Sequence, residues 1–160
     1  MLKKCLSFSM VAASLFIATP TLAKNVTADL YQIAGVLQDN GYQAKLEGEG
    51  NDRSIKTGMA GYTFVILPFS CEDDGTDCKS VQFYTAFDPV KSPTLEEMNS
   101  YAAANRFGRI YLDHEGDPAI EMDIDLEAGG MSEALFMDNL AYWEAIMVSF
   151  AEFSLTDRDE

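Results

Sequence analysis

The stretch that decides the fold is NRFGRIYLDHEGDPAIEMDIDL, residues 105–126. It reads as two strands of alternating apolar and polar residues, joined by a short turn that contains Gly116. The long helical patterns before and after it each need a sheet on which to bury an apolar side. One face of the two strands is apolar: Ile110, Leu112, Ile120, Met122, Ile124 and Leu126. The other face carries Arg109, Tyr111, Asp113, Glu121, Asp123 and Asp125.

The turn determines how the two strands pair. A three-residue loop, 114–116, places Gly116 in the left-handed conformation that a hairpin of this length requires. A slip by one residue would turn the apolar side chains into water, so the pattern favours a single register. That register makes three pairs: Asp113 with Asp117, Ile110 with Ile120, and Arg109 with Glu121.

The N-terminus has the pattern of a signal peptide over residues 1–23. Two lysines come first, an apolar run covers residues 5–19, and small residues precede a cleavage position after Ala23. The next residue is Lys24, whereas a lipid anchor requires a cysteine there. The pattern therefore predicts an exported bacterial protein, periplasmic or secreted. An uncleaved membrane anchor is the alternative.

The chain is strongly acidic, with a formal charge of −15 that becomes −17 once the two signal lysines are removed. Such a charge repels phosphate backbones and anionic lipid surfaces, so nucleic acid and, after cleavage, membranes are not expected as partners. A basic protein or a cation is electrostatically favoured. Residues 24–155 have the length of one domain with a proper core, and residues 156–160 are predicted to be a flexible acidic tail.

Two cysteines remain after cleavage, Cys71 and Cys78, on either side of a loop that holds four acids and Gly75. An even count in an exported chain predicts a disulfide, here at the base of a hairpin. On the loop-closure model such a bond removes about 2–3 kcal/mol of unfolded-state entropy. A redox-active pair is one alternative, but no basic residue lies close before Cys71 to activate its thiol. A metal site is the other, and no second Cys or His pair completes one.

Apolar spacing and cap residues predict the other elements. A first helix begins at the cap Thr27 and stops at Gly41, and a second begins at a capping box of Thr94 and Glu97. The run YTFVILPF is almost wholly apolar and is predicted to be a buried central strand. Four strands lie between these helices, over residues 43–47, 54–59, 62–69 and 80–88. The order α-β-β-β-β-α-β-β-α is typical of an α+β domain with helices on an antiparallel sheet.

The last helix begins at Ser132 and runs to about residue 153. A smaller apolar stripe of Met137, Ala141 and Val148 lies away from its main apolar arc, as either a subunit contact or tolerated surface. The main arc should lie on the sheet and consists of Phe136, Leu140, Trp143, Ile146, Met147, Phe150 and Phe153.

The sequence offers no catalytic constellation, and we predict no catalytic, cofactor or metal residue. His114, the single histidine, falls at the predicted turn, without a serine elbow, a glycine-rich phosphate loop or a zinc motif. The acids from Asp113 to Glu127 alternate in a way that can hold calcium, but the loop template and its closing glutamate are missing. The alternative to a non-enzymatic protein is an envelope hydrolase or a calcium-binding protein that uses this acidic hairpin.

NRFGRIYLDHEGDP, followed by EMDIDL and by LFMDNLAYW in the last helix, resembles the YbjN family. Its members are commonly labelled bacterial sensory transduction regulators, and the resemblance covers roughly residues 26–153. It implies a fold similar to type III secretion chaperones, small α+β proteins that often form homodimers and hold partner polypeptides. The family supplies no catalytic motif. The chain differs from cytosolic relatives in its signal peptide and cysteine pair, so a cytoplasmic regulatory role is not expected.

We therefore expect an exported, non-enzymatic protein-interaction module, chaperone-like or regulatory, with an unidentified protein partner and the capacity to form a homodimer. An acidic inhibitor of a basic envelope protein is a further alternative, because a strong negative field attracts basic surfaces. An enzyme needs a pocket with converging acids, whereas a binding module needs an exposed apolar groove or sheet edge. Deep burial of Asp123 and Asp125 beside Asp113 would argue against the binding module.

Overall fold

Six antiparallel strands form one sheet in the order β1-β2-β3-β4-β6-β5. This computed structural model describes residues 25–157, so the predicted signal peptide and the end of the predicted tail lie outside the described residues. The strands are β1 Ala44–Glu47, β2 Ser54–Met59, β3 Tyr62–Phe69, β4 Ser80–Ala86, β5 Arg109–Leu112 and β6 Pro118–Asp125. The helices are α1 Leu30–Asp39, the short 3-10 helix η1 Gly50–Asp52, α2 Leu95–Ala104 and α3 Glu133–Ser154.

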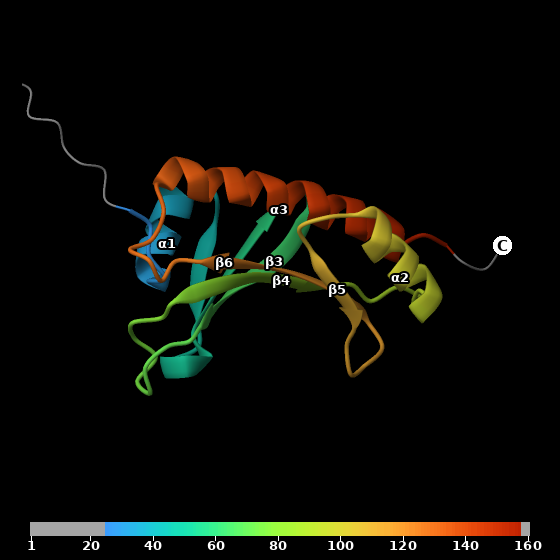
Figure 1. The fold of residues 1–160 in the computed structure, drawn as a ribbon, viewed down its shortest axis with the longest axis horizontal. Coiled ribbons are helices and arrows are strands. Elements are labelled where there is room, and N and C mark those ends of the chain that lie inside the picture. The colour runs from blue at the N-terminus through green and yellow to red at the C-terminus, as the bar shows by residue number, and fades with distance from the viewer. Residues whose placement is uncertain (1–24, 158–160) are drawn as a thin grey trace, which may run out of the picture.

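The helices all lie on one side of the sheet or at its ends. Figure 1 shows α3 crossing the sheet from end to end, with α1 and α2 near the two ends of α3. The element order and the antiparallel sheet confirm the predicted α+β class. Within residues 25–157, no helix covers the opposite face of the sheet (Figure 1). None of the described helices has the length and apolarity needed to cross a membrane.

The core between α3 and the sheet is built from aromatic rings. Trp143 is completely buried at the middle of α3, and its ring lies 5.5 Å from that of Phe64 and 5.8 Å from that of Phe83. Phe136 meets Phe83 edge-on at 6.0 Å. Each such ring removes on the order of 150–250 Å² from water, so this cluster supplies much of the hydrophobic stabilisation of the domain.

The hairpin register predicted from the sequence is confirmed. Arg109 pairs with Glu121 and Ile110 with Ile120. The turn is closed by the N–H of Asp113, which donates to the carbonyl of Asp117 at 2.9 Å. Gly116 has a φ of 89°, the left-handed conformation that the turn requires.

The start of the first helix differs from the prediction. Asp29, not Thr27, is the N-cap, because its carboxylate accepts hydrogen bonds from the N–H groups of Tyr31 and Gln32. The Thr27 hydroxyl instead donates to the side-chain oxygen of Gln32 at 2.7 Å. A carboxylate satisfies the free amides of a first turn at least as well as a hydroxyl, so the later residue prevails.

The other predicted helix starts are confirmed. Thr94 and Glu97 form the capping box of α2, with the Thr94 N–H donating to Glu97 at 2.7 Å. Ser132 caps α3 by accepting from the N–H of Leu135. Gly41, with a φ of 88°, follows the end of α1. These residues fix where α2 and α3 begin and where α1 ends.

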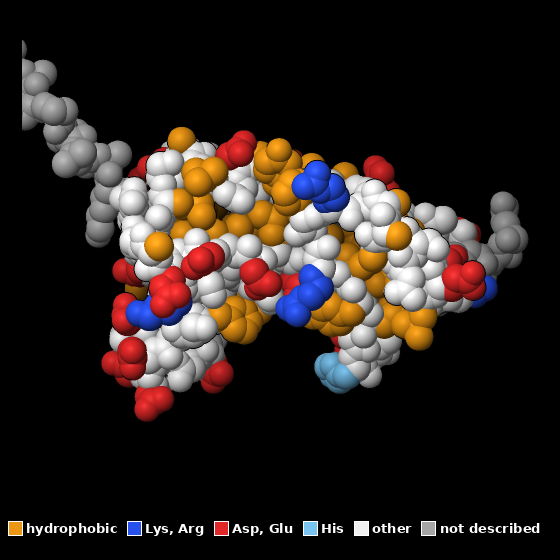
Figure 2. All heavy atoms as spheres, in the orientation of Figure 1, with side chains coloured by type: hydrophobic (Ala, Val, Ile, Leu, Met, Phe, Trp, Pro, Cys, Tyr) orange, Lys and Arg blue, Asp and Glu red, His pale blue; other side chains and the backbone are white. Residues whose placement is uncertain are grey.

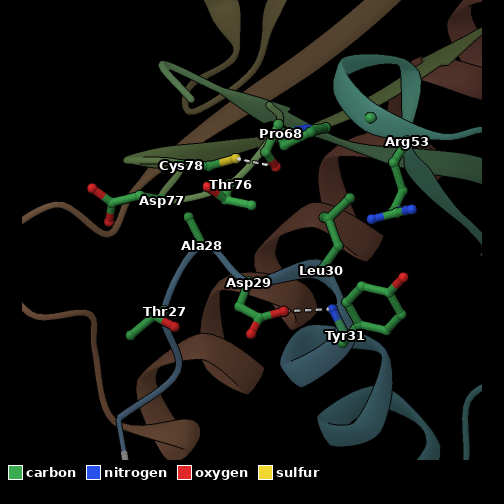
Figure 3. Close-up of a pocket in the computed structure, with 12 residues that line it drawn as sticks. Thr27, Ala28, Asp29, Leu30, Tyr31, Arg53, Pro68, Thr76, Asp77 and Cys78 are labelled. Carbon is green, nitrogen blue, oxygen red and sulfur yellow. Dashed lines mark hydrogen bonds between the residues drawn. The ribbon is translucent and has the colours of Figure 1, made fainter. Parts of the chain in front are cut away.

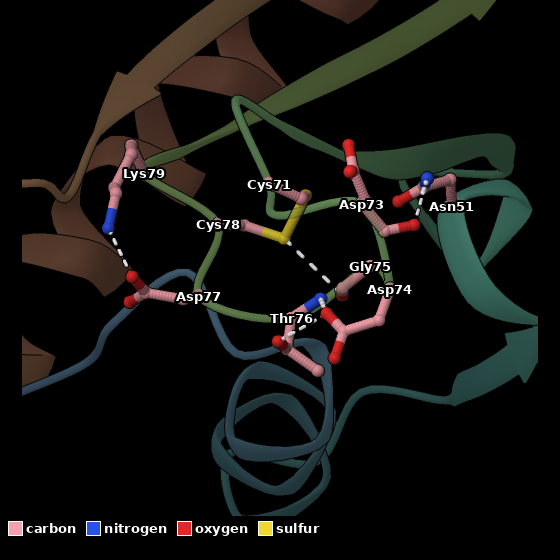
Figure 4. Close-up of a disulfide and its surroundings, with 9 residues drawn as sticks. All are labelled: Asn51, Cys71, Asp73, Asp74, Gly75, Thr76, Asp77, Cys78 and Lys79. Atoms are coloured by element: carbon pink, nitrogen blue, oxygen red, sulfur yellow. Dashed lines mark hydrogen bonds and ion pairs between the residues drawn. A yellow bond between two sulfur atoms is a disulfide. The ribbon is translucent and has the colours of Figure 1, made fainter.

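Cys71 and Cys78 form the predicted disulfide at the base of the β3–β4 hairpin (Figure 4). The loop that it closes packs against η1, where Asn51 donates to the carbonyl of Asp73 at 3.1 Å. Gly75 approaches Gly50 so closely that an added Cβ would lie 2.7 Å from its carbonyl carbon. The disulfide loop and η1 therefore form one projecting unit.

Candidate functional site: the open face of the sheet

The candidate site is the face of the sheet that no described helix covers, which we call the open face. Strand alternation places there Val65, Leu67, Gln82, Tyr84, Arg109, Tyr111, Glu121 and Asp123. The register aligns Tyr84, Glu121 and Arg109 in one row across three strands, with Gln82 and Asp123 in the next. The open face thus has polar residues on β4, β6 and β5, apolar residues on β3, and the lysines Lys56 and Lys45 on β2 and β1.

The open face is hollowed between two projecting turns. Figure 1 shows the disulfide loop with η1 at one end and the β5–β6 turn at the other, both pointing away from α3. Figure 2 shows the space between these two projections as a hollow in the surface. A cavity of about 530 Å³ lies against the β5–β6 side, lined by Leu67, Gln82, Tyr84, Tyr111, Leu112, Asp113, His114 and Glu121.

Glu121 is the unexpected residue of this face. The sequence placed it on the solvent-facing side, but it is only 4% exposed. Two long side chains of the neighbouring strand bury it: Arg109 forms an ion pair with its carboxylate, and the Tyr111 hydroxyl donates to it at 3.3 Å. Arg109 itself stays two-thirds exposed. The carboxylate of Glu121 is therefore covered by two side chains that solvent can itself reach.

Two phenols stand beside this carboxylate and stay neutral. Burial raises the pKa of Tyr111 to about 12, and the negative charge of Glu121 adds to the shift. Burial also raises the pKa of Tyr84, and the charges of Asp113, Glu121 and Asp117 add to it. Both phenols keep their protons at ordinary pH, so Tyr84 offers a donor to the hollow, whereas the Tyr111 proton is already donated to Glu121.

The apolar part of the open face comes from β3. The sequence predicted a buried central strand there, and β3 does lie inside the sheet, with Phe64 and Ile66 buried against α3. Its alternate residues Val65 and Leu67 are only half-buried, because no second layer covers the open face. Next to them Gln82 is buried and donates to Asp123 at 2.9 Å. The apolar run of β3 thus places side chains on both faces of the sheet, and helices cover only one of these faces.

The acids of the β5–β6 turn cluster because the turn itself brings them together. Asp113, Glu115 and Asp117 each place a carboxylate oxygen within 4.8 Å of the others. The Asp113 carboxylate accepts from the N–H groups of Glu115 and Asp117, both at 2.9 Å, and the bond from Asp117 lowers its pKa. Burial and the charge of Asp88 raise the pKa of Asp117. These hydrogen bonds account for the cluster without a cation.

The other residues weighed for chemistry do not converge. His114 is 89% exposed, and its Nε2 lies 3.9 Å from a carboxylate oxygen of Glu115. Asp123 and Asp125 are exposed rather than buried beside Asp113. In the described part of the chain, the histidine therefore has no serine or cysteine partner, and the geometry that would argue against a binding module is not seen.

The predicted stripe on the last helix lies elsewhere. Met137 and Val148 are half-buried, Ala141 is exposed, and Met137 packs against the core. Since α3 lies on the covered side of the sheet, none of the three belongs to the open face. Sequence reasoning missed Tyr84, Val65 and Leu67: the continuous apolar run was the available signal for Val65 and Leu67, and the alternation within residues 81–87 was the signal for Tyr84.

A second cavity lies between the start of α1 and the disulfide loop (Figure 3). It also measures about 530 Å³, and Arg53 lies beside it with its guanidinium 5.1 Å from the centre of the Tyr31 ring. The Asp29 carboxylate at its edge already caps α1. Its charged groups are thus engaged by the fold, which makes it a weaker candidate than the open face.

Comparison with known proteins identifies one family. The YbjN model, described as "Putative bacterial sensory transduction regulator", matches residues 29–155. Searches of the curated proteins and of the solved structures each gave no significant match. The matched range contains every strand of the sheet and all three α-helices.

Proposed function

Because the chain belongs to the YbjN family, we propose that it is a non-enzymatic protein-interaction module, chaperone-like or regulatory, that binds a partner polypeptide on its open face. One observation carries the proposal: a six-stranded sheet is covered by helices on one side only. The uncovered side presents half-buried Leu67 and Tyr84 in a hollow, with half-buried Val65 on the same face. Apolar surface in a concavity, bordered by polar groups, is typical of binding sites.

Charge indicates the kind of partner. The disulfide loop at one end of the hollow carries four acids, and the β5–β6 turn at the other carries Asp113, Glu115 and Asp117. Two acidic projections on either side of a floor with polar residues on three strands and apolar residues on β3 favour a polypeptide with basic residues at its ends and some apolar residues between them. Inhibition of a basic envelope protein is one form that such binding would take.

The proposed setting is the bacterial periplasm or exterior. The predicted signal peptide and the Cys71–Cys78 disulfide support export, since disulfides persist in oxidising compartments. Self-association through Met137, Ala141 and Val148 is a separate prediction, and sedimentation of the wild type against a Val148→Lys variant would test it.

Site-specific photo-crosslinking tests the proposal. A photoreactive phenylalanine at Leu67 lies in the hollow, and one at Val90, fully exposed in the loop before α2, is the matched control. In bacterial cells, we expect the Leu67 probe to crosslink to one polypeptide rich in basic residues, and the Val90 probe not to. Equal labelling from both positions, or none from Leu67, would contradict binding at the open face.

A further inference from the structure

β6 is longer than the strand beside it. β6 runs over Pro118–Asp125, but β5 pairs only with residues 118–121. On that side of the sheet β5 is the last strand. The second half of β6, residues 122–125, therefore has a neighbouring strand on one side only, and we call its free side the β6 edge.

Hydrogen bonds to the neighbouring strands show which backbone groups face the β6 edge. The carbonyl of Pro118 accepts from Phe87, and the N–H of Leu126 donates to Lys79, so even-numbered residues face the β4 side. Odd-numbered residues face the β5 side, as the carbonyl of Asp117 does. Asp123 and Asp125 thus turn N–H and C=O groups towards a side where no described strand pairs with them.

The β6 edge is free because of the backbone at Phe107. The β5–β6 register would place Phe107 opposite Asp123, but Phe107 has a φ of 72°. A positive φ is a rare conformation for a bulky residue and ends the extended strand at this point. Its ring instead lies 5.0 Å from that of Tyr142 on α3. The chain is thus turned off β6 just before it would cover the free groups.

The two sides of the β6 edge differ in chemistry. On the α3 side, three large hydrophobic residues are exposed: Phe107 at 56%, Leu135 at 49% and Tyr142 at 47%. Leu135 and Tyr142 are seven residues apart and so share a side of α3. Figure 2 shows hydrophobic atoms at the surface between α3 and β6. On the open-face side, Asp123 and Asp125 are exposed.

We propose that the β6 edge accepts an extended segment of the partner as a further antiparallel strand, in line with β5. Residues that pair across two strands share a face, so those opposite Asp123 and Asp125 lie on the open face and are basic. Those opposite Met122 and Ile124 point towards Leu135 and Tyr142 and are apolar. This inference rests on the proposed function and specifies the chemistry of the partner: a segment in which basic and apolar residues alternate.

Charge argues against a second copy of the chain as the occupant. Two β6 edges related by a two-fold axis would pair antiparallel and bring the acids Asp123 and Asp125 of one copy against those of the other. Like charges directly opposite each other destabilise a strand pair. A basic segment meets the same acids with the opposite sign.

Amide exchange measured by NMR with defined peptides tests the inference. The probe is the capped peptide Val-Lys-Val-Lys-Val, and the controls are Val-Glu-Val-Glu-Val and a form of the lysine peptide with N-methylated lysine amides. With the lysine peptide at saturation, we expect exchange at the Asp123 and Asp125 amides to slow by about tenfold or more. Neither control peptide should slow it.

A charge-reversed variant provides the second arm. Asp123→Lys with Asp125→Lys should weaken binding of the lysine peptide by about tenfold and favour the glutamate peptide. Asp39→Lys with Glu96→Lys makes the same charge change at exposed positions on α1 and α2 and should leave binding unchanged. If both double variants behave alike, the effect is one of net charge and the β6 edge is not the site.

The outcomes separate this inference from the proposed function. Unprotected Asp123 and Asp125 amides, together with a specific crosslink at Leu67, would overturn strand addition and leave binding at the open face intact. Protection of these two amides without a crosslink at Leu67 would support strand addition and contradict binding at the open face. Protection that rises with protein concentration in the absence of peptide would identify a second copy as the occupant and overturn the inference.

Discussion

On the covered face of the sheet, Phe64, Phe83 and Trp143 pack ring against ring with no access to water. On the open face, the row of Tyr84, Glu121 and Arg109 crosses the same strands with polar atoms directed at a hollow. Both faces follow from one alternating sequence. The covered face is committed to stability, whereas the open face places apolar and polar side chains together around a hollow that solvent reaches, as a surface that binds and releases a partner requires.

The largest expected difference between the faces is in the cost of removing an aromatic ring. Trp143→Ala should lower the free energy of unfolding by about 3–5 kcal/mol, because it opens a cavity in a closed core. Tyr84→Ala, on the half-buried open face, should cost about 1–1.5 kcal/mol. Urea unfolding followed by circular dichroism would measure both, since the first variant lacks the single tryptophan.

A milder substitution sharpens the same comparison. The indole N–H of Trp143 is buried without a hydrogen-bond partner in the described chain. Trp143→Phe should therefore cost much less than Trp143→Ala, because it removes an unsatisfied donor along with some packing. Equal costs for Trp143→Ala and Tyr84→Ala would show that the open face is as tightly packed as the core.

The next effect concerns the buried carboxylate. Arg109→Ala should destabilise the protein by about 1–2 kcal/mol, because Glu121 loses its charged partner while it stays buried under Tyr111. Replacing Glu121 with Gln in the Arg109→Ala background should restore part of this loss. Chemical denaturation of the two variants gives both values.

An arginine just before β5 is the control. Arg106 lies over the exposed ring of Phe107, so Arg106→Ala should change stability by less than about 0.5 kcal/mol. If Arg109→Ala is equally harmless, the ion pair behaves as an ordinary surface pair and Glu121 is better solvated than its burial indicates.

The smallest effect is a pH dependence that Tyr111 gives to the open face. The pKa of Tyr111 is raised from 10.0 to about 12, so the folded state holds this proton after the unfolded state has lost it. Stability from this group is complete below about pH 10 and falls as the pH rises towards about 12. Absorbance titration of the phenolates should show a late step that Tyr111→Phe removes.

The stability curve checks the sign of this dependence. Between about pH 10 and pH 12, the wild type should lose stability more steeply than Tyr111→Phe. A parallel decline in the two proteins would place the Tyr111 hydroxyl in water, away from Glu121.

The hairpin and its register could be predicted because alternation leaves a single pairing that buries Ile110 and Ile120 together. The cap of α1 could not, because Thr27 and Asp29 both precede the helix and only their contacts decide between them. The class of fold followed from the number and order of the elements. Local pattern was therefore sufficient where one arrangement buried all the apolar residues.

The candidate site was harder to predict because it depends on relations between elements. Glu121 reads as a surface acid until Arg109 and Tyr111 reach across from the next strand. Likewise, Val65 and Leu67 read as core residues, because the sequence does not reveal that all the helices gather on one side of the sheet. Such features arise from tertiary packing, which no single stretch of sequence encodes.

The position of β5 also limits how far an added strand can extend along β6. Towards the β5–β6 turn, an added residue opposite Glu121 would run into Arg109, since β5 occupies that line. The β6 edge is thus closed at the end where β5 begins, and an added strand can extend only away from β5. The partner segment must therefore end or turn away opposite Met122, so its position within the partner chain would be selected as well as its charge.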